Sequence, residues 1–474
     1  MSRFLYPTPT PAPRPVATLP RRPVVEPTIV APRTTPAVKA PTFAFEPAPP
    51  VSMAQKAGLI ALSIYLVGAY ANDISMRLLH IKPYLTITAG VAVLIAFVFC
   101  GASTLPVLRH PISKVWLFLM FWMTLAAISS RWPGGSFTLL ENYFPKSHLV
   151  LFYMGAFALN LEQCRKLFLV KVLVAAIVLI SCVAFGTSSG GRFMIPDSLW
   201  FENPNELALV LLLSLGFFLF LIEESGLIGK ALGVMGLIAT AYYLLKTGSR
   251  GSAIALLVVL LGMFIVSRHR MKMLMFSVPA IFVLLLVTPS NTLHRLTLIV
   301  SDPANEIAAS IQELGDRGDE SSLDSQFQRQ QLLRQSLRYT IQHPLLGIGP
   351  GEFSDAYQHD SQKRGVHVAD LGTHNTYTQL SSETGLPGGI AFIVLVLLAV
   401  KTNFRLYRLT RNRPELKTVA NMALCLFACT LGYAVNVMFH HLAYTGYMAE
   451  LGGLTVAVWL AGNRAMEATP ARAT

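Results

Sequence analysis

Twelve long apolar segments limit this chain to one broad kind of fold. A helix needs about 20 residues to cross the hydrocarbon core of a bilayer. Only 13% of the residues are charged and 53% are hydrophobic, whereas soluble domains carry roughly 25% charged residues. We therefore predict an all-α integral membrane protein with about 12 transmembrane helices. The predicted spans are residues 53–71, 84–101, 113–130, 148–161, 167–186, 205–222, 229–246, 251–267, 272–288, 387–402, 417–437 and 443–461.

The positions of the predicted spans divide the chain into five regions. Residues 1–50 hold 14 of the 29 prolines, a composition that cannot bury a core, so we expect a disordered cytoplasmic tail. Spans one to nine occupy residues 51–288, and spans ten to twelve occupy 387–462. A hydrophilic segment, 289–386, separates the ninth span from the tenth, and residues 463–474 form a C-terminal tail.

Loop charges orient the predicted bundle. With the N-terminal tail in the cytoplasm, the inner connections carry most of the Lys and Arg residues, among which we count Lys171. This bias is the positive-inside signal of a multi-pass protein of a bacterial inner membrane, and an even number of spans places both termini in the cytoplasm. Segment 289–386 then becomes a large extracytoplasmic loop. The net charge of +13 is explained by topology, so it does not call for a nucleic-acid partner.

The large loop contains one helical pattern. Phe327, Leu332, Leu333, Leu337 and Ile341 recur at helical spacing and predict an amphipathic helix. His343-Pro344 should end it, because proline disfavours a helical residue before it. Residues 347–351, Gly-Ile-Gly-Pro-Gly, predict a tight turn. This turn follows a helix rather than a strand, so it does not indicate a dinucleotide site.

Several functions are excluded by what the sequence lacks. It has no G-x-x-x-x-G-K-[ST], no D-x-D, no H-E-x-x-H and no Cys/His cluster with zinc spacing. We therefore expect no cofactor and no metal. The spans carry almost no ionisable residues apart from Glu206 and Glu450 near outer ends, which argues against an ion-coupled transporter. Cys425 and Cys429 should pack on one helix face.

Arginines on the predicted outer face could bind phosphate. Arg192 follows two glycines, and Arg250 lies in the polar break Lys246-Thr247-Gly248-Ser249-Arg250-Gly251. A guanidinium beside a Gly-Ser turn and a helix start offers a planar fork next to free N–H groups. The alternative is an arginine that only extends to the lipid headgroups.

Histidines lie on the same predicted face. His374 stands in Gly372-Thr373-His374-Asn375, and a histidine there can accept a proton from a sugar hydroxyl. The alternative is an ordinary surface histidine. For His440 and His441 the same two interpretations, a proton acceptor or a surface histidine, stay open.

At these residues the chain resembles the O-antigen ligase and bacterial polysaccharide polymerase superfamily. The pattern H-[NSQ]-x9-G-x-x-[GTY] reads here as His374-Asn375, nine residues, Gly385, two residues and Gly388. The loop 342–353, the element Thr247–Gly251 and the turn Asn203-Pro204-Asn205 are also similar. The motifs cover roughly residues 190–400.

The resemblance implies a metal-independent, inverting transfer of a glycan from undecaprenyl diphosphate to an acceptor hydroxyl outside the membrane. In this view Arg250 and Arg192, with Lys246 as a neighbour, would bind the diphosphate, and His374 would activate the acceptor. Asn375, His440 and His441 are candidates for the acceptor side. The acceptor would be lipid A core for a ligase, a growing glycan for a polymerase, or a protein hydroxyl for an oligosaccharyltransferase. Polysaccharide-export machinery is a candidate partner.

Two other classes stay open. A non-enzymatic transporter of lipid-linked glycans could use the same arginines, but it would not need His374. An assembly scaffold without chemistry would need neither residue.

Overall fold

The computed structural model describes residues 51–77, 80, 84–189, 192–198, 201, 203–267, 320–363, 365 and 371–468; for residues 73 and 320–327 it describes the backbone alone. The chain divides into two units, Met1–Phe45 and Glu46–Thr474, and the described residues all belong to the second.

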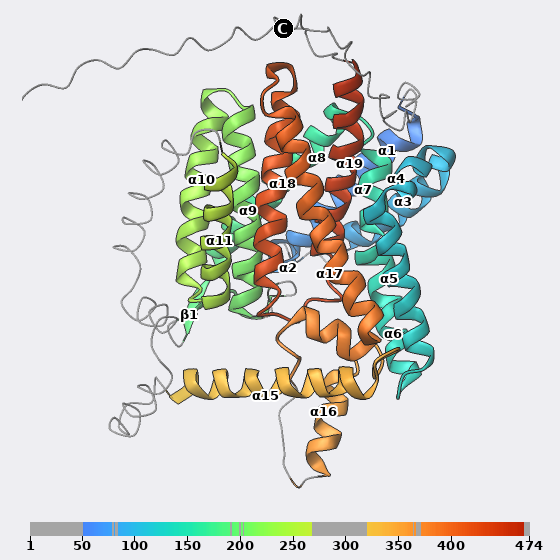
Figure 1. The fold of residues 1–474 in the computed structure, drawn as a ribbon. Coiled ribbons are helices and arrows are strands. Elements are labelled where there is room, and N and C mark those ends of the chain that lie inside the picture. The colour runs from blue at the N-terminus through green and yellow to red at the C-terminus, as the bar shows by residue number, and fades with distance from the viewer. Residues whose placement is uncertain are drawn as a thin grey trace, which may run out of the picture. The chain divides into compact units, whose positions relative to one another are not determined.

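A bundle of membrane-length helices dominates the second unit (Figure 1). Within the described ranges, eight helices are long and apolar enough to cross a membrane. They are α1 (Met53–Tyr70), α3 (Tyr84–Cys100) with its continuation to Arg109 through η1 (Gly101–Thr104) and α4 (Leu105–Arg109), α5 (Pro111–Ile128), α8 (Leu161–Phe185), α9 (Pro204–Glu224), α10 (Leu227–Lys246), α17 (Thr376–Thr410), and α18 (Lys417–Asn436) with the short η3 (Pro414–Leu416) before it.

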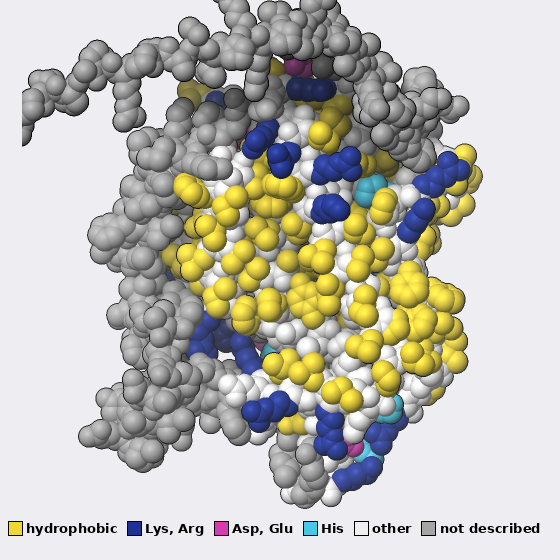
Figure 2. Space-filling view, viewed as in Figure 1, with side chains coloured by type: hydrophobic (Ala, Val, Ile, Leu, Met, Phe, Trp, Pro, Cys, Tyr) yellow, Lys and Arg dark blue, Asp and Glu magenta, His cyan; other side chains and the backbone are white. Residues whose placement is uncertain are grey.

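The surface of this bundle fits a bilayer. Figure 2 shows a hydrophobic belt around the middle of the visible face, with Lys and Arg side chains gathered above and below it. Many large apolar side chains on the membrane-length helices are exposed, such as Val98 and Phe99 on α3. In water such an apolar surface would promote aggregation, whereas in a bilayer lipid chains solvate it. The protein is therefore a multi-pass membrane protein.

Four predicted spans are not among these eight. The segment 148–161 contains only α7 (Val150–Phe157), which continues α6 (Pro133–Tyr143) through a π-helical turn, η2 (Phe144–His148). Eight residues rise about 12 Å, too short to cross the hydrocarbon core. Segment 251–267 forms α11 (Arg250–Val266), and 443–461 corresponds to α19 (Tyr447–Ala468). Segment 272–288 lies outside the described residues, so the count of twelve stays a prediction.

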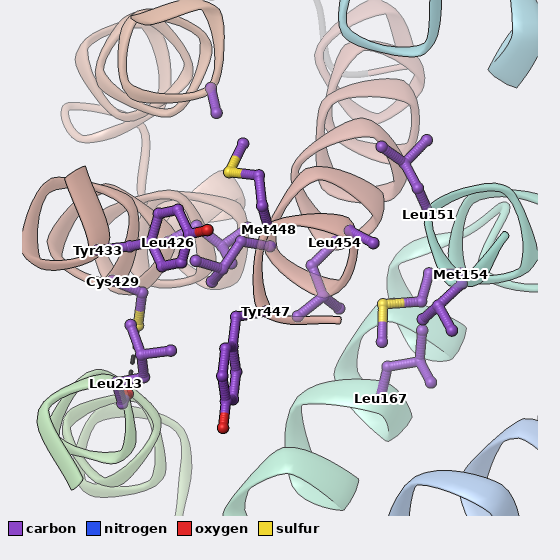
Figure 3. Close-up of a cluster of buried hydrophobic side chains, with 14 of the residues drawn as sticks. Leu151, Met154, Leu167, Leu213, Leu426, Cys429, Tyr433, Tyr447, Met448 and Leu454 are labelled. Atoms are coloured by element: carbon purple, nitrogen blue, oxygen red, sulfur yellow. Dashed lines mark hydrogen bonds between the residues drawn. The ribbon is translucent and has the colours of Figure 1, made fainter. Parts of the chain in front are cut away.

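Helix α19 runs through the centre of the packed core (Figure 3). Tyr447, Met448 and Leu454 from this helix point toward side chains of α7, α8, α9 and α18. Cys425 and Cys429 on α18 are both buried thiols, and Gly216 of α9 packs against them. The prediction that these cysteines pack a helix face is confirmed.

One end of the bundle carries the remaining elements. The hairpin β1 (Thr187–Ser189) and β2 (Arg192–Met194) precedes α9, and α2 (Asn72–Arg77) follows α1. Helix α15 (Glu320–Gln342) lies crosswise below the bundle, with α16 (Phe353–Gln362) next to it (Figure 1). The helix predicted over 327–341 is confirmed and ends just before His343-Pro344, but Leu333, Leu337 and Ile341 of its predicted apolar face are exposed.

Helix α17 is broken near this end. Gly385 has φ +76° and ψ 178°, a conformation that interrupts the helix two residues before Pro387. The loop 344–351 satisfies the groups that the break releases: Ile348 and Gly349 donate N–H bonds to the carbonyls of Ser382 and Glu383, both at 3.0 Å. The predicted tight turn is confirmed, with positive φ at Gly347, Gly349 and Gly351.

Candidate functional site

Three helices begin close together at the end that carries α15. Each has a polar residue as its N-cap: Asn203 for α9, Ser249 for α11 and Asn375 for α17. Capping leaves part of the first-turn N–H groups unsatisfied, and the helix dipole adds positive potential there. The following contacts show that these three starts form one site.

Arg192 links the hairpin to two of these helix starts. Its Nη2 donates to Asn205 Oδ1 at 2.5 Å, and its Nε donates to the carbonyl of Thr247 at 3.5 Å. Asn205 lies in the first turn of α9, whereas Thr247 directly precedes the turn into α11. The Asn203-Pro204-Asn205 turn therefore both caps a helix, through Asn203, and holds an arginine, through Asn205.

The Thr247–Gly251 element places Arg250 at the first position of α11. Gly248 has φ +62°, which allows the chain to reverse between α10 and α11. A Cβ on Gly251 would lie 2.7 Å from the Phe439 ring, so only glycine allows this close approach. Ser252 accepts a hydrogen bond from Asn436 Nδ2 at 2.6 Å and so joins α11 to α18.

Lys246 has a different setting from the two arginines. Its Nζ lies 4.9 Å from the centroid of the Phe193 ring and 5.7 Å from that of Tyr242. These cation–π contacts join the end of α10 to the hairpin strand that carries Arg192. The lysine therefore supports the hairpin from the side.

His374 occupies a constrained position immediately before α17. Its φ is +51°, rare for a residue with a side chain. Its ring meets that of His441 edge-on, with 5.0 Å between centroids. A Cβ on Gly372 would lie 2.7 Å from the His441 ring, so the turn wraps this second histidine. Burial, followed by His441 and Arg329, lowers the pKa of His374 to about 4.

Asn375 serves as the N-cap of α17. Its Oδ1 accepts from the N–H groups of Tyr377 at 3.0 Å and Thr378 at 3.2 Å. These are the hydrogen bonds that an N-cap asparagine usually accepts, and they fix the direction of the chain just after His374. The structure thus gives Asn375 a local structural task; a contact with the acceptor stays a prediction.

His440 is held by its backbone next to these groups. Its carbonyl accepts from Thr376 Oγ1 at 2.7 Å, and the same hydroxyl accepts from the N–H of Leu442 at 2.9 Å. The side chain is 4% exposed, and its Nε2 has no hydrogen-bond partner. Burial lowers the pKa of His440 well below the ordinary value, with Arg329 as the next cause. The imidazole is therefore neutral at pH 7.

Arg329 is the site residue that sequence reasoning missed. It lies on α15, partly buried, and its pKa is lowered by burial and by the charge of Arg250. The sequence held a signal for it: Arg329 lies three residues before the buried Leu332 and seven before the buried Ser336, on the inward face of the predicted helix. A basic residue on that face should contact the bundle.

Electrostatic interactions link Arg329 with Arg250, His374 and His440, and Arg192 with His440. Figure 2 shows basic side chains bordering a hollow between the hydrophobic belt and the end with α15. No group of three metal-ligating side chains occurs among the residues that the structure describes. The arrangement is suited to an anion of high charge, since arginines and helix N-termini both favour phosphate oxygens.

The comparison with protein families identifies part of this site. Residues 235–393 match the model of the O-antigen ligase family. Over this segment the chain is similar to that family. The matched segment includes Arg250, Arg329 and His374, whereas Arg192, His440 and His441 lie outside it. A comparison with curated proteins gave no match. The match favours a ligase- or polymerase-type activity and suggests lipid-linked glycans as the substrate class.

Proposed function

We propose that the protein transfers a glycan from undecaprenyl diphosphate to an acceptor hydroxyl, in the assembly of a cell-surface polysaccharide. The reaction would take place at the end of the bundle that carries α15, on the extracytoplasmic side of the bacterial inner membrane. The observation that carries this proposal is that Arg192, Arg250 and His374 lie beside the starts of α9, α11 and α17. The family match at residues 235–393 supports the class of reaction.

The donor diphosphate would lie against Arg192 and Arg250. Arg192 is already fixed by Asn205 and Thr247, so its orientation needs little further ordering when the anion binds. The chemistry breaks the bond between the anomeric carbon and the phosphate oxygen, and the diphosphate leaves with the electron pair. Preorganised cations stabilise that developing charge, which is where electrostatic catalysis acts.

His374 would act on the acceptor. As the acceptor oxygen attacks the anomeric carbon, its proton passes to an imidazole nitrogen of His374, and the new glycosidic bond forms opposite the leaving diphosphate. A single displacement of this kind inverts the anomeric centre. It uses no metal, because the arginines supply the positive charge. His441, in ring contact with His374, would help to orient it.

The test compares His374→Ala with Arg250→Ala in the full chain, reconstituted in lipid nanodiscs with a lipid-linked glycan donor and an acceptor glycan. Arg250→Ala should weaken donor binding. His374→Ala should bind donor normally but lower the transfer rate by about 10²–10⁴-fold, the usual effect of losing a general base. Lys166→Ala serves as a control, because this exposed lysine pairs with Glu162 on the surface of α8.

The same experiment separates an enzyme from a transporter. A transporter would respond to Arg250→Ala and not to His374→Ala, because it moves no proton. Ligase and polymerase differ in the glycan left on the carrier when the gene is deleted. Single repeat units would indicate a polymerase, and long chains stranded on the carrier would indicate a ligase.

A further inference from the structure

One exposed face of α17 changes from apolar to basic along its length. In the middle of the helix this face carries three exposed apolar side chains at helical spacing, Ile390, Val394 and Leu397. The same spacing continues with three exposed cations, which we call the basic stripe: Lys401, Arg405 and Arg408. The stripe lies at the end of the bundle opposite α15 (Figure 1), and Lys and Arg side chains border the hydrophobic belt at that end (Figure 2).

The length of this face matches one leaflet of a bilayer. At 1.5 Å per residue, Lys401 lies about 16 Å along the helix from Ile390. Half of the hydrocarbon core of a bilayer is about 15 Å thick. With the exposed apolar side chains against the acyl chains of that leaflet, the basic stripe therefore begins at the level of the phosphate groups.

Aromatic contacts fix the central cation of the stripe. Arg405 Cζ lies 5.6 Å from the centroid of the Trp459 ring on α19. The other neighbour of this indole is His110, whose ring meets it edge-on with 6.4 Å between centroids. His110 is the N-cap of α5 and accepts from the N–H of Ile112 at 3.2 Å. A guanidinium stacked on a held ring keeps its N–H edges available for phosphate oxygens, and tryptophan is enriched at headgroup level.

Carboxylates at the same end of the bundle pair with other cations. Glu223 lies 3.6 Å from Lys417, and Glu162 lies 2.7 Å from Lys166. Within the described part of the chain, the ion pairs include none of the three cations of the basic stripe. The positive charge of the stripe is therefore not neutralised by an ion pair within that part of the chain, whereas that of Lys417 and Lys166 is.

We propose that the basic stripe and Trp459 form a binding site for an anionic glycerophospholipid. The phosphodiester of the lipid lies against Arg405 and its two neighbours, and its acyl chains lie along the apolar part of the same face. Each cation near an anionic headgroup contributes about fivefold to affinity, whereas a zwitterionic lipid brings its own positive charge to the stripe. The site lies at the other end of α17 from His374, and it does not depend on the proposed glycan transfer.

The experiment is native mass spectrometry of the full chain, released from micelles that contain equal amounts of phosphatidylglycerol and phosphatidylcholine with the same acyl chains. The wild type should retain phosphatidylglycerol in preference. Arg405→Gln should reduce that preference about fivefold, and Lys401→Gln with Arg405→Gln about 25-fold. Lys417→Gln is the matched control, because it removes the same charge at the same end from a lysine that is already paired. It should keep the wild-type preference.

Thermal unfolding gives a second measurement, because a ligand that binds the folded state raises its stability. Added phosphatidylglycerol should raise the Tm of the wild type and of Lys417→Gln more than that of Arg405→Gln. If Arg405→Gln does not fold, Lys401→Gln gives the same comparison.

Three results would overturn the inference. The first is a wild type that retains both lipids equally. The second is an equal loss of preference in Lys417→Gln and Arg405→Gln, which would indicate a diffuse attraction to all cations at this end. The third is displacement of phosphatidylglycerol by an equal concentration of glycerol 3-phosphate, which would indicate a site for a free phosphate ester instead of a lipid.

Discussion

Arg192 shows how much depends on one hydrogen bond between side chains. Its hairpin is short, two strands of three residues each, and cannot by itself hold a long side chain still. Asn205 accepts from the guanidinium at 2.5 Å, and a hydrogen bond to a charged group contributes about 1.5–3 kcal/mol. Asn203, two residues earlier, instead accepts from backbone N–H groups of α9. Two asparagines in one turn therefore have separate tasks.

These two asparagines give a matched pair of variants. Asn205→Ala should lower affinity for a prenyl diphosphate by about tenfold, or about 1.4 kcal/mol, because Arg192 loses the hydrogen bond that orients it. Asn203→Ala should lower stability by about 1 kcal/mol through the lost cap, with a smaller effect on affinity. Titration with geranyl diphosphate and thermal unfolding measure the two effects. Reversal of this pattern would show that Asn203, not Asn205, positions the arginine.

Asn375 can be tested in the same way, because its cap and an acceptor contact predict different outcomes. Serine is as good an N-cap as asparagine, whereas alanine costs about 1 kcal/mol of stability. As a cap, Asn375→Ser should keep most of the transfer rate, and Asn375→Ala should lower both stability and rate. A large loss of rate in a stable Asn375→Ser protein would instead place the amide against the acceptor.

At the scale of elements, hydropathy located the spans but could not show where α17 begins. The predicted span starts at residue 387, yet the helix starts at Thr376, because its first section is polar and still buried: Gln379, Ser382 and Glu383. Because this first section contains few apolar residues, the sequence analysis assigned it to the loop 289–386. Hydrogen bonds from the loop 344–351 and from Tyr444 satisfy these buried polar groups. The Tyr444 hydroxyl donates to Glu383 at 2.5 Å. Such long-range partners are invisible in a single sequence.

The glycines of the His374 pattern have a structural explanation. Gly385 breaks α17, and a Cβ there would lie 2.1 Å from the carbonyl oxygen of Leu345, which is backbone and cannot move aside. A Cβ on Gly388 would meet Thr384 Oγ1 at 2.0 Å. The pattern was identified by family resemblance; its spacing follows from the distance along α17 between the histidine and the helix break.

Gly385→Ala should therefore destabilise the protein by about 2–4 kcal/mol, since it combines a positive φ with a backbone clash. Gly388→Ala should cost less, because the Thr384 side chain can change rotamer. Thermal unfolding in detergent gives the two values. Hydrogen exchange at Ile348 and Gly349 should accelerate in Gly385→Ala, because their N–H groups bond to the broken helix. Equal stability losses in both variants would contradict the argument from backbone geometry.

At the scale of the whole molecule, one buried ion pair joins distant parts of the bundle. Lys171 Nζ lies 2.5 Å from Glu450 Oε2, with side chains 9% and 13% exposed. Lys171 belongs to the interior of α8 and not to an inner connection, and Glu450 lies in the first turn of α19. The assignment of Lys171 to an inner connection was therefore wrong, and its pairing with Glu450 was not predicted. The two residues are 279 positions apart, and no local pattern connects them.

The pair also has aromatic surroundings. Lys171 Nζ lies 5.1 Å from the centroid of the Tyr70 ring on α1 and 5.8 Å from that of Phe217 on α9. A cavity lined by Tyr70, Lys171, Phe217 and Glu450 lies between the four helices. The contacts of a single ammonium group thus connect α1, α8, α9 and α19, so removing it should affect the assembly of the bundle more than the site at its end.

Removing one partner should harm the protein more than removing both. Lys171→Met leaves the Glu450 carboxylate buried without its counter-charge, which costs about 3–5 kcal/mol. Adding Glu450→Gln removes that charge and should recover most of the loss, because replacing a whole buried pair by neutral residues is often nearly neutral. Thermal unfolding of the wild type, both single variants and the double variant gives the coupling energy directly. A double variant as unstable as Lys171→Met alone would show that the lysine stabilises the bundle through its aromatic neighbours instead of through Glu450.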